Sequence, residues 1–313
     1  MSATPGLVTV QTKRATRAPR HYERGAVSFA DRKKLSVRIA LGISQSLLLI
    51  ALIVVSLGPL VWLFMAALAE SQTLVRNPMG VFTSGQFLWE NFVTAWTTIR
   101  VGQYLLNTLW VVGGSWFVTI FTCMTGAYVL SVLRPKWGGF VAGAILATLF
   151  IPNVISLVPL YLTIIEMPLL NISLLDTYWA VWLPHAASPF LLLVFKRFFD
   201  AIPPELYEAA RIDGAGPIRV FTTIILPMSK PIIGVASLLT IVASWKDFLW
   251  PMLVLPNASL QPISVALPRV AEIVPLNIQM AALFLAIIFP VGLFLVLQRY
   301  FLEGAGSAGA LKG

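Results

Sequence analysis

Long apolar runs decide what this chain can fold into. The stretch 39–69 contains no charged residue, and a helix needs about 20 mostly apolar residues to cross a hydrocarbon core about 30 Å thick. Hydrophobic residues make up 58% of the chain and charged residues only 11%, which is outside the range of ordinary soluble domains. The sequence therefore predicts an all-α, polytopic membrane protein rather than one large soluble core.

Six runs of this kind follow one another along the chain. They predict transmembrane helices at about 39–69, 104–133, 138–163, 178–195, 231–255 and 279–301. Pro152 and Pro159 fall inside the third run, so we expect a kink or a broken helix there. Together the spans predict a membrane domain over 39–303, followed by a tail at 304–313. Six spans place both ends of the chain on one side of the membrane.

Basic residues orient these spans. The segment 1–38 holds nine Lys and Arg residues against two acidic ones, a net charge of +7 out of the chain's +9. Short loops rich in Lys and Arg stay cytoplasmic, and the pair Arg134 and Lys136 and the stretch from Lys196 to Lys230 fit the same side. The loops between them are balanced or acidic. Both termini are therefore predicted to be cytoplasmic.

The basic segment 1–38 is interpreted as a disordered tail that sets topology and faces anionic lipid. A nucleic-acid-binding role is the alternative, but the only aromatic residues there are Tyr22 and Phe29, and a membrane span follows directly. A secretory signal peptide does not fit either, because the apolar run that follows is too long and no small-residue cleavage site closes it.

The sequence offers little for catalysis or metal binding. Cys123 is the single cysteine, and His21 and His185 are the only histidines, so neither a thiolate cluster nor a histidine metal site is expected. No Gly-Lys pair of a phosphate-binding loop and no nucleophile elbow occurs. The chain is therefore predicted not to be an enzyme. His185 is interpreted as a satisfied interior polar group, with a pore-lining role as the alternative.

The polar stretch 198–230 separates two apolar runs. Pro203 and Pro204 favour the start of a helix, Glu205 and Glu208 complement its positive end, and Gly214 suits a left-handed cap. Spacings of three and four place Leu206, Ala209, Ala210 and Asp213 on one face, where the small alanines would let another protein come close. A second short helix is predicted from Pro217, with Pro227 ending it. The result is a corner of two helices hinged at glycine.

This stretch resembles the EAA loop of binding-protein-dependent ABC importer permeases, most closely the MalG-like sugar permeases of the carbohydrate-uptake branch. The resemblance extends from about residue 39 to residue 313. The motifs that carry it are Glu208-Ala209-Ala210-Arg211-Ile212-Asp213-Gly214-Ala215, Phe221, Ile225-Leu226-Pro227, Asn171, Thr177-Tyr178-Trp179-Ala180, Leu183-Pro184, Phe198-Phe199, Ile202-Pro203, Trp245, Asp247-Phe248-Leu249-Trp250-Pro251 and Gly309-Ala310-Leu311-Lys312-Gly313. The chain departs from the pattern at Lys246, where the family commonly has Asn, and at Ala310-Leu311, where a valine is more usual.

The resemblance implies a function and a set of partners. The chain would be one of two permease subunits in a bacterial inner membrane, working with a second, homologous permease, a pair of ATPase subunits and an extracytoplasmic solute-binding protein. ATP and Mg would be bound by the ATPases, and no cofactor by this chain. The stretch 198–230 would be the coupling loop seated on an ATPase. The residues implied in coupling are Glu205, Glu208, Ala209, Ala210, Arg211, Asp213 and Gly214.

Polar residues at membrane depth suggest a transport path. Asn153, Trp245 and Asp247 are the candidates, because ionisable and polar side chains inside a span usually face a cavity or a protein partner. Asp247 and its neighbour Lys246 do not share a helix face, so different partners are expected, and interfacial anchoring is an equal alternative for them. A secondary transporter or channel driven by an ion gradient is the alternative function.

Overall fold

The computed structural model describes residues 34–83, 85, 87–168 and 170–310. The chain consists of two compact units, Met1–Gly58 and Pro59–Gly313. Within the described residues the regular elements are helices, and the one strand-like feature is a bridge between Met167 and Ile172. The all-α fold class is confirmed. Most of the predicted N-terminal tail, residues 1–33, lies outside the described residues, whereas Leu35 to Arg38 already belong to the first helix.

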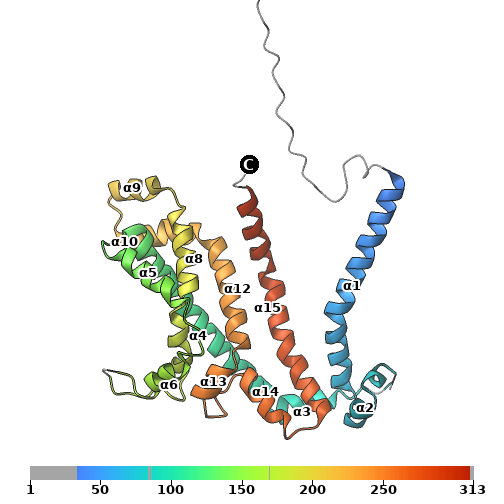
Figure 1. The fold of residues 1–313 in the computed structure, drawn as a ribbon. Helices are drawn as coiled ribbons and strands as arrows, with labels where there is room; N and C mark the ends of the chain where they lie inside the picture. The colour runs from blue at the N-terminus through green and yellow to red at the C-terminus, as the bar shows by residue number, and fades with distance from the viewer. Residues whose placement is uncertain (1–33, 84, 86, 169, 311–313) are drawn as a thin grey trace, which may run out of the picture. The chain divides into compact units, whose positions relative to one another are not determined.

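Figure 1 shows the helices and their labels. In chain order they are α1 (Leu35–Leu68), α2 (Ser71–Arg76), α3 (Glu90–Thr97), α4 (Val101–Tyr128), α5 (Gly138–Thr148), α6 (Leu157–Ile165), α7 (Trp179–Ala186), α8 (Pro189–Asp200), α9 (Pro204–Ile212), α10 (Pro217–Val220), α11 (Leu226–Met228), α12 (Lys230–Lys246), α13 (Leu249–Val254), α14 (Ile263–Ala271) and α15 (Leu276–Ala310). A short 3-10 helix covers Pro78–Phe82, and π-helical turns cover Val129–Leu133 and Phe221–Ile225.

Three helical segments of the described chain are each long and apolar enough to cross a membrane, namely Leu35–Leu68, Val101–Leu133 and Leu276–Leu295. The pair α7 and α8, bent by 45°, meets the same test as one broken span. These segments overlap the first, second, sixth and fourth predicted spans. The count of six spans stays a prediction. The helix α15 continues to Ala310, so the predicted tail 304–313 is helical over residues 304–310.

The third and fifth predicted spans are interrupted. Residues 149–156 separate α5 from α6, which confirms the break expected near Pro152. The fifth span was predicted as one helix over 231–255, but α12 ends at Lys246 and α13 begins at Leu249. Between them Asp247 has an extended backbone, with ψ of 123°.

The helix α4 lies at the centre of the second unit and packs against α7, α8 and α12. Its small residues Cys123 and Ala127 are fully buried, and the large side chains Phe195 and Phe199 of α8 are buried in the same cluster. In a membrane, where lipid is as apolar as leucine, close packing of this kind is a main source of helix association. The cluster continues into the segment 198–230, so the end of α4 supports that segment directly.

Candidate functional sites at a helical corner and a polar cavity

The two helices α9 and α10 form a corner, which comprises residues 203–228 and lies at the end of the second unit away from α6 and α13 (Figure 1). Pro204 occupies the first turn of α9, where a missing N–H costs nothing, and Glu205 lies beside the positive end of the helix dipole. These local signals agree with the start predicted from the sequence.

The end of α9 is a Schellman motif. Gly214 has φ of +79°, its N–H donates to Arg211 O at 3.0 Å, and the Ala215 N–H donates to Ala210 O at 2.9 Å. These are the two hydrogen bonds that define the motif, and the left-handed residue between them is usually glycine. The conformation predicted for Gly214 is therefore confirmed.

The second helix of the corner differs from its prediction. The helical course from Pro217 passes through the π-helical turn Phe221–Ile225 and continues past Pro227 to Met228, so Pro227 does not end it. A proline inside an α-helix lacks an N–H and clashes with the carbonyl four residues earlier. A π-helical turn directly before it displaces the hydrogen-bond ladder and relieves that conflict. The chain then turns by 77° into α12.

Aromatic side chains attach the corner to α4 and α8. The Tyr128 hydroxyl donates to Pro217 O at 2.9 Å, and the buried Tyr207 hydroxyl donates to Phe199 O at 3.3 Å. Burial raises the pKa of Tyr207 to about 12, and the charge of Asp200 adds to this while Arg134 opposes it. Val220 is buried in the same cluster. The corner is thus held from its inner side.

A polar link strengthens the attachment at the ends of α4 and α8. Asp200 accepts hydrogen bonds from Ser131 Oγ at 2.6 Å and from Lys196 Nζ at 2.7 Å. Burial acts to raise the pKa of Asp200, but these two hydrogen bonds and the charges of Lys196 and Arg134 outweigh it, so the pKa is lowered. The carboxylate of Asp200 therefore stays ionised and joins the two helices.

The outer side of the corner carries the residues that the sequence assigns to coupling. Their side chains are exposed with the exception of Ala210, which is half-buried against the core cluster; the exposed ones are Glu205, Glu208, Ala209, Arg211, Asp213 and Gly214. The two alanines therefore differ in exposure, and Ala209 is the more accessible to a partner. Ile212 and Ile218 are 86% and 81% exposed. Ile212 was named only as part of the resemblance motif and Ile218 not at all, although two isoleucines in a polar loop are a readable signal.

A second site forms where broken helices meet. A cavity of about 310 Å³, hereafter the polar cavity, is lined by Asn153 from the break before α6, His185 from the last turn of α7, and Asp247 from the break between α12 and α13. The remaining lining is apolar and includes Trp250 and Leu157. Two of the three predicted path residues, Asn153 and Asp247, are thus brought together, and His185 joins them.

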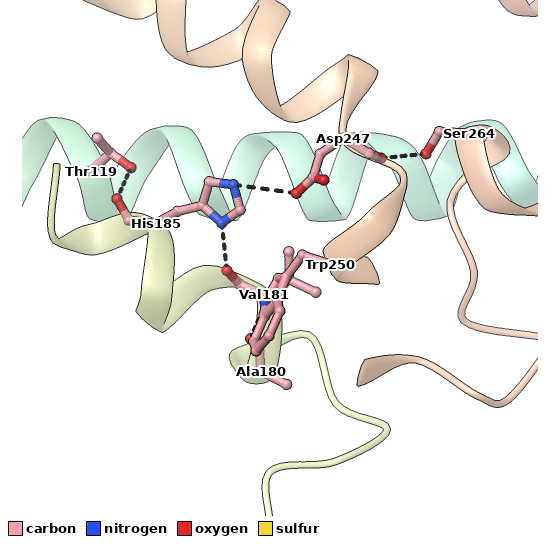
Figure 2. A network of polar contacts seen from close by, with 7 residues as sticks. All are labelled: Thr119, Ala180, Val181, His185, Asp247, Trp250 and Ser264. Carbon is pink, nitrogen blue, oxygen red and sulfur yellow. Dashed lines mark hydrogen bonds and ion pairs between the residues drawn. The ribbon is translucent and has the colours of Figure 1, made fainter. Parts of the chain in front are cut away.

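Prolines in or beside the helices that end at two of these breaks leave carbonyl groups without helical donors. Pro184 cannot donate to Ala180 O, and instead the Trp250 indole N–H donates to that oxygen at 3.0 Å (Figure 2). Pro189 cannot donate to His185 O, and the Thr119 hydroxyl of α4 does so at 2.8 Å. In this way distant side chains satisfy the backbone.

The break between α12 and α13 follows the same rule. Pro251 cannot donate to Asp247 O, and the Ser264 hydroxyl of α14 donates to it at 2.7 Å. Discontinuous helices at membrane depth are tolerated only where the freed groups are satisfied by protein or line a cavity. Each freed carbonyl is therefore held by a side chain from another helix, beside the polar cavity.

The side chains of His185 and Asp247 face one another in the polar cavity (Figure 2). His185 Nε2 lies 3.6 Å from Asp247 Oδ2, and the two side chains are 25% and 23% exposed. The other ring nitrogen, Nδ1, lies 2.8 Å from Val181 O. His185 therefore has partners, as the sequence analysis expected of an interior polar group, and it also lines the cavity.

Trp245 and Lys246 lie elsewhere. The Trp245 ring stacks on Phe289 with centroids 4.9 Å apart. Trp245 and Lys246 line a separate groove together with Ser264 and Pro290. Asp247 and Lys246 thus have different surroundings, as expected for neighbours in sequence. The role of Trp245 in a transport path stays a prediction.

Comparison with known proteins agrees with this architecture. A family model described as "Binding-protein-dependent transport system inner membrane component" matches residues 120–303, which include the corner and all three polar residues of the cavity. The chain is 33% identical over 261 residues to the probable ABC transporter permease protein YurM of Bacillus subtilis, covering 82% of this chain and 83% of that protein.

Further similarities extend over most of the chain. It is 31% identical over 278 residues to the sn-glycerol-3-phosphate transport system permease protein UgpE of Agrobacterium fabrum, covering 85% of this chain and 96% of that protein. A chain in the crystal structure of a bacterial ABC transporter that imports the acidic polysaccharide alginate has the same fold, with a TM-score of 0.73 at 20% identity, over 86% of this chain and 98% of that one.

Proposed function

The chain belongs to the inner-membrane components of binding-protein-dependent transport systems, and from this premise we propose that it is one of two permease subunits of an ABC importer for a sugar or sugar-like solute. Its partners are a second, homologous permease, a pair of ATPase subunits that bind ATP and Mg, and an extracytoplasmic solute-binding protein. Membrane lipid surrounds the spans, and the chain itself performs no catalysis. Both termini and the α9–α10 corner face the cytoplasm of a bacterial cell.

The corner is the proposed coupling element, and its two-sided construction is the observation that carries this assignment. The inner side is fixed to α4 and α8 through Tyr128, Tyr207 and Asp200. The outer side leaves Glu208, together with its charged and small neighbours, accessible to a partner. A protein that pushes on the outer side would move the corner as a rigid body and shift the attached helices, which is how small movements become domain rearrangements.

The polar cavity is the proposed part of the transport path in this subunit. Transporter binding sites are often built at breaks in discontinuous helices, and here three breaks converge on Asn153, His185 and Asp247. Amide and carboxylate groups suit the hydroxyl groups of a sugar or polyol. The solutes named for similar proteins, glycerol 3-phosphate and alginate, are hydroxylated. A sugar or sugar-like solute is therefore the class proposed for this chain.

A charge reversal on the outer side of the corner tests the coupling role. We expect Glu208→Lys to abolish ATP-driven uptake and to weaken recruitment of the ATPase subunits, while membrane insertion stays normal. The matched control is Glu272→Lys, the same change at an exposed residue that follows α14, and it should transport normally.

The assay is uptake into proteoliposomes that contain both permeases, the ATPases and the binding protein, with radiolabelled maltose and sn-glycerol 3-phosphate as probes. ATPase recruitment is measured by co-purification. Normal uptake by the Glu208→Lys complex would remove the support for coupling at the corner. Uptake that needs an ion gradient and no ATPase would instead establish the alternative, a secondary transporter.

A further inference from the structure

We propose that His185 is the charge partner of Asp247 in the polar cavity, and that the two side chains form an imidazolium–carboxylate pair with no net charge. His185 then acts as a positioning residue that fixes the carboxylate and cancels its charge, so that the cavity accepts neutral or anionic hydroxylated solutes. The consequence for transport rests on the proposed function, whereas the protonation state of the pair does not.

The Nδ1 atom of His185 carries a proton in this arrangement. Val181 O can only accept a hydrogen bond, and it lies 2.8 Å from His185 Nδ1, so Nδ1 must carry hydrogen. In a neutral imidazole the other nitrogen, Nε2, would then be a bare acceptor. It faces the carboxylate of Asp247 at 3.6 Å, and two acceptors without a proton between them repel each other. The pair must therefore hold one further proton.

The basicity of the two groups determines which of them holds the further proton. Imidazole is the more basic of the two groups in water, and about a quarter of each side chain is exposed where the two residues line the cavity. The proton therefore belongs on Nε2. His185 then donates from Nδ1 to Val181 O and places its positive charge 3.6 Å from Asp247 Oδ2, and the backbone at each end is fixed by Thr119 and Ser264.

Other titratable groups on the surrounding helices are directed elsewhere. Lys246 lines the groove beside Trp245, the Cys123 thiol contacts Ser188 O, the Tyr178 hydroxyl donates to Asn107 Oδ1, Tyr161 packs against the cluster around Val181, and Arg269 reaches the Tyr104 hydroxyl. None of these recorded contacts is to the pair. The charge of Asp247 is therefore balanced within the cavity by His185.

The net charge of the His185–Asp247 pair determines which solutes the cavity can bind. A bare carboxylate at this depth would repel an anionic solute and attract a cation. A paired carboxylate still has free lone pairs that accept hydrogen bonds from hydroxyl groups, while the imidazolium compensates its charge. The structure thus favours uncharged polyols and their phosphate or carboxylate derivatives over cations.

The protonation state can be measured without any transport. The full chain carrying His21→Gln retains His185 as its single histidine, and it can be produced with isotopically labelled histidine and studied by solid-state NMR in lipid nanodiscs. At neutral pH we expect both ring nitrogens to be protonated. Asp247→Asn should leave hydrogen on Nδ1 only. A neutral ring in the unsubstituted pair, or spectra unchanged by Asp247→Asn, would overturn the proposal.

Charge rescue tests the consequence for transport in the assembled complex. We expect His185→Gln, which leaves an unpaired carboxylate, to reduce sn-glycerol 3-phosphate or maltose uptake at least about tenfold, whichever probe the complex carries. The double variant His185→Gln with Asp247→Asn is neutral again and should recover most of the uptake. A double variant no better than the single one would contradict the charge-balancing role. If neither probe enters the unsubstituted complex, the proposed function fails. The NMR result would still decide the protonation state of His185 and Asp247.

Discussion

The α9–α10 corner and the polar cavity are both built at prolines, yet their backbone groups are satisfied in different ways. In the corner, Pro204 and Pro217 occupy helix starts, where a missing N–H leaves no carbonyl without a donor. In the cavity, Pro184, Pro189 and Pro251 each free a carbonyl that a side chain from a distant segment must satisfy. The corner is therefore a local structure, and the cavity is a contact between helices.

This difference assigns each region a mechanical role. A local structure can move as one body, whereas a contact between helices responds whenever those helices shift. The helix α4 takes part in both regions, because Tyr128 holds the corner and Thr119 holds the end of α7 beside His185. The corner and the cavity are therefore joined through α4, and also through α8 and α12, which lead from the corner to the breaks beside His185 and Asp247. Variants that damage one region and spare the other test this arrangement.

The largest effect is expected at the buried anchor of the corner. Tyr207→Ala removes an aromatic side chain that is only 9% exposed, and truncations of this kind cost about 3–5 kcal/mol in a packed core. Hydrogen exchange of the α9 amides should accelerate strongly, and exchange at α7 should not change. The neighbouring Leu206, which is 41% exposed, supplies the control Leu206→Ala. Equal acceleration at α7 would mean that the two regions do not unfold separately.

In the cavity, the largest loss of stability is expected at Thr119, the residue of α4 that donates to His185 O. Thr119→Val keeps the shape of the side chain but leaves His185 O without its donor, at a cost of about 1–3 kcal/mol. We expect a lower midpoint of thermal unfolding and faster exchange at the end of α7, with the corner unaffected. Thr119→Ser retains the hydroxyl and should restore both values.

Thr122→Val, at an exposed position of the same helix, is the matched control for this substitution. It should change the unfolding midpoint little. If Thr119→Val and Thr122→Val behaved alike, the hydrogen bond to His185 O would not be what stabilises this end of α7.

The difference between local contacts in the corner and contacts between distant helices in the cavity also explains what the sequence could predict. The caps of α9 depend on residues within one turn, so Pro204, Glu205 and Gly214 could be recognised directly. Polar residues at membrane depth are also visible in a sequence, and two of the three proposed path residues, Asn153 and Asp247, do share a cavity. Local signals were sufficient for these features.

The cavity itself could not be derived in this way. Its pairs join helices far apart in the chain, as in the contact of His185 with Asp247, and no periodicity specifies such a pairing. Trp245 was a path candidate together with Asp247, but residues two apart lie on different helix faces. The break at Asp247 had a readable signal, because a proline at position 251 removes the donor for the carbonyl four residues earlier.

A smaller effect is expected at the glycine cap of the corner. At Gly214, with φ of +79°, an added Cβ is strained even though no atom lies within 4 Å; Gly214→Ala should destabilise α9 by roughly 1 kcal/mol. Gly216 has φ of −70° and is equally open, so Gly216→Ala is a control that differs only in backbone conformation. Equal hydrogen-exchange rates for the α9 amides in the two variants would show that the left-handed cap does not limit the corner.

The smallest expected effect concerns the link between α4 and α8. Since the pKa of Asp200 is lowered in the folded protein, its ionised form stabilises the fold at pH values above the unfolded pKa of about 3.9. This contribution is lost as the pH falls through the lower, folded value. Asp200→Asn should therefore lower the unfolding midpoint at neutral pH and show a smaller further fall in acid, because the partners Lys196 and Ser131 have already lost the carboxylate. The control is Asp213→Asn, at the exposed acid in the C-cap position of α9, and this variant should keep the full dependence of the unfolding midpoint on acid pH. If the midpoint of Asp200→Asn fell with pH in parallel to that of the unsubstituted chain, the acid sensitivity would belong to another group.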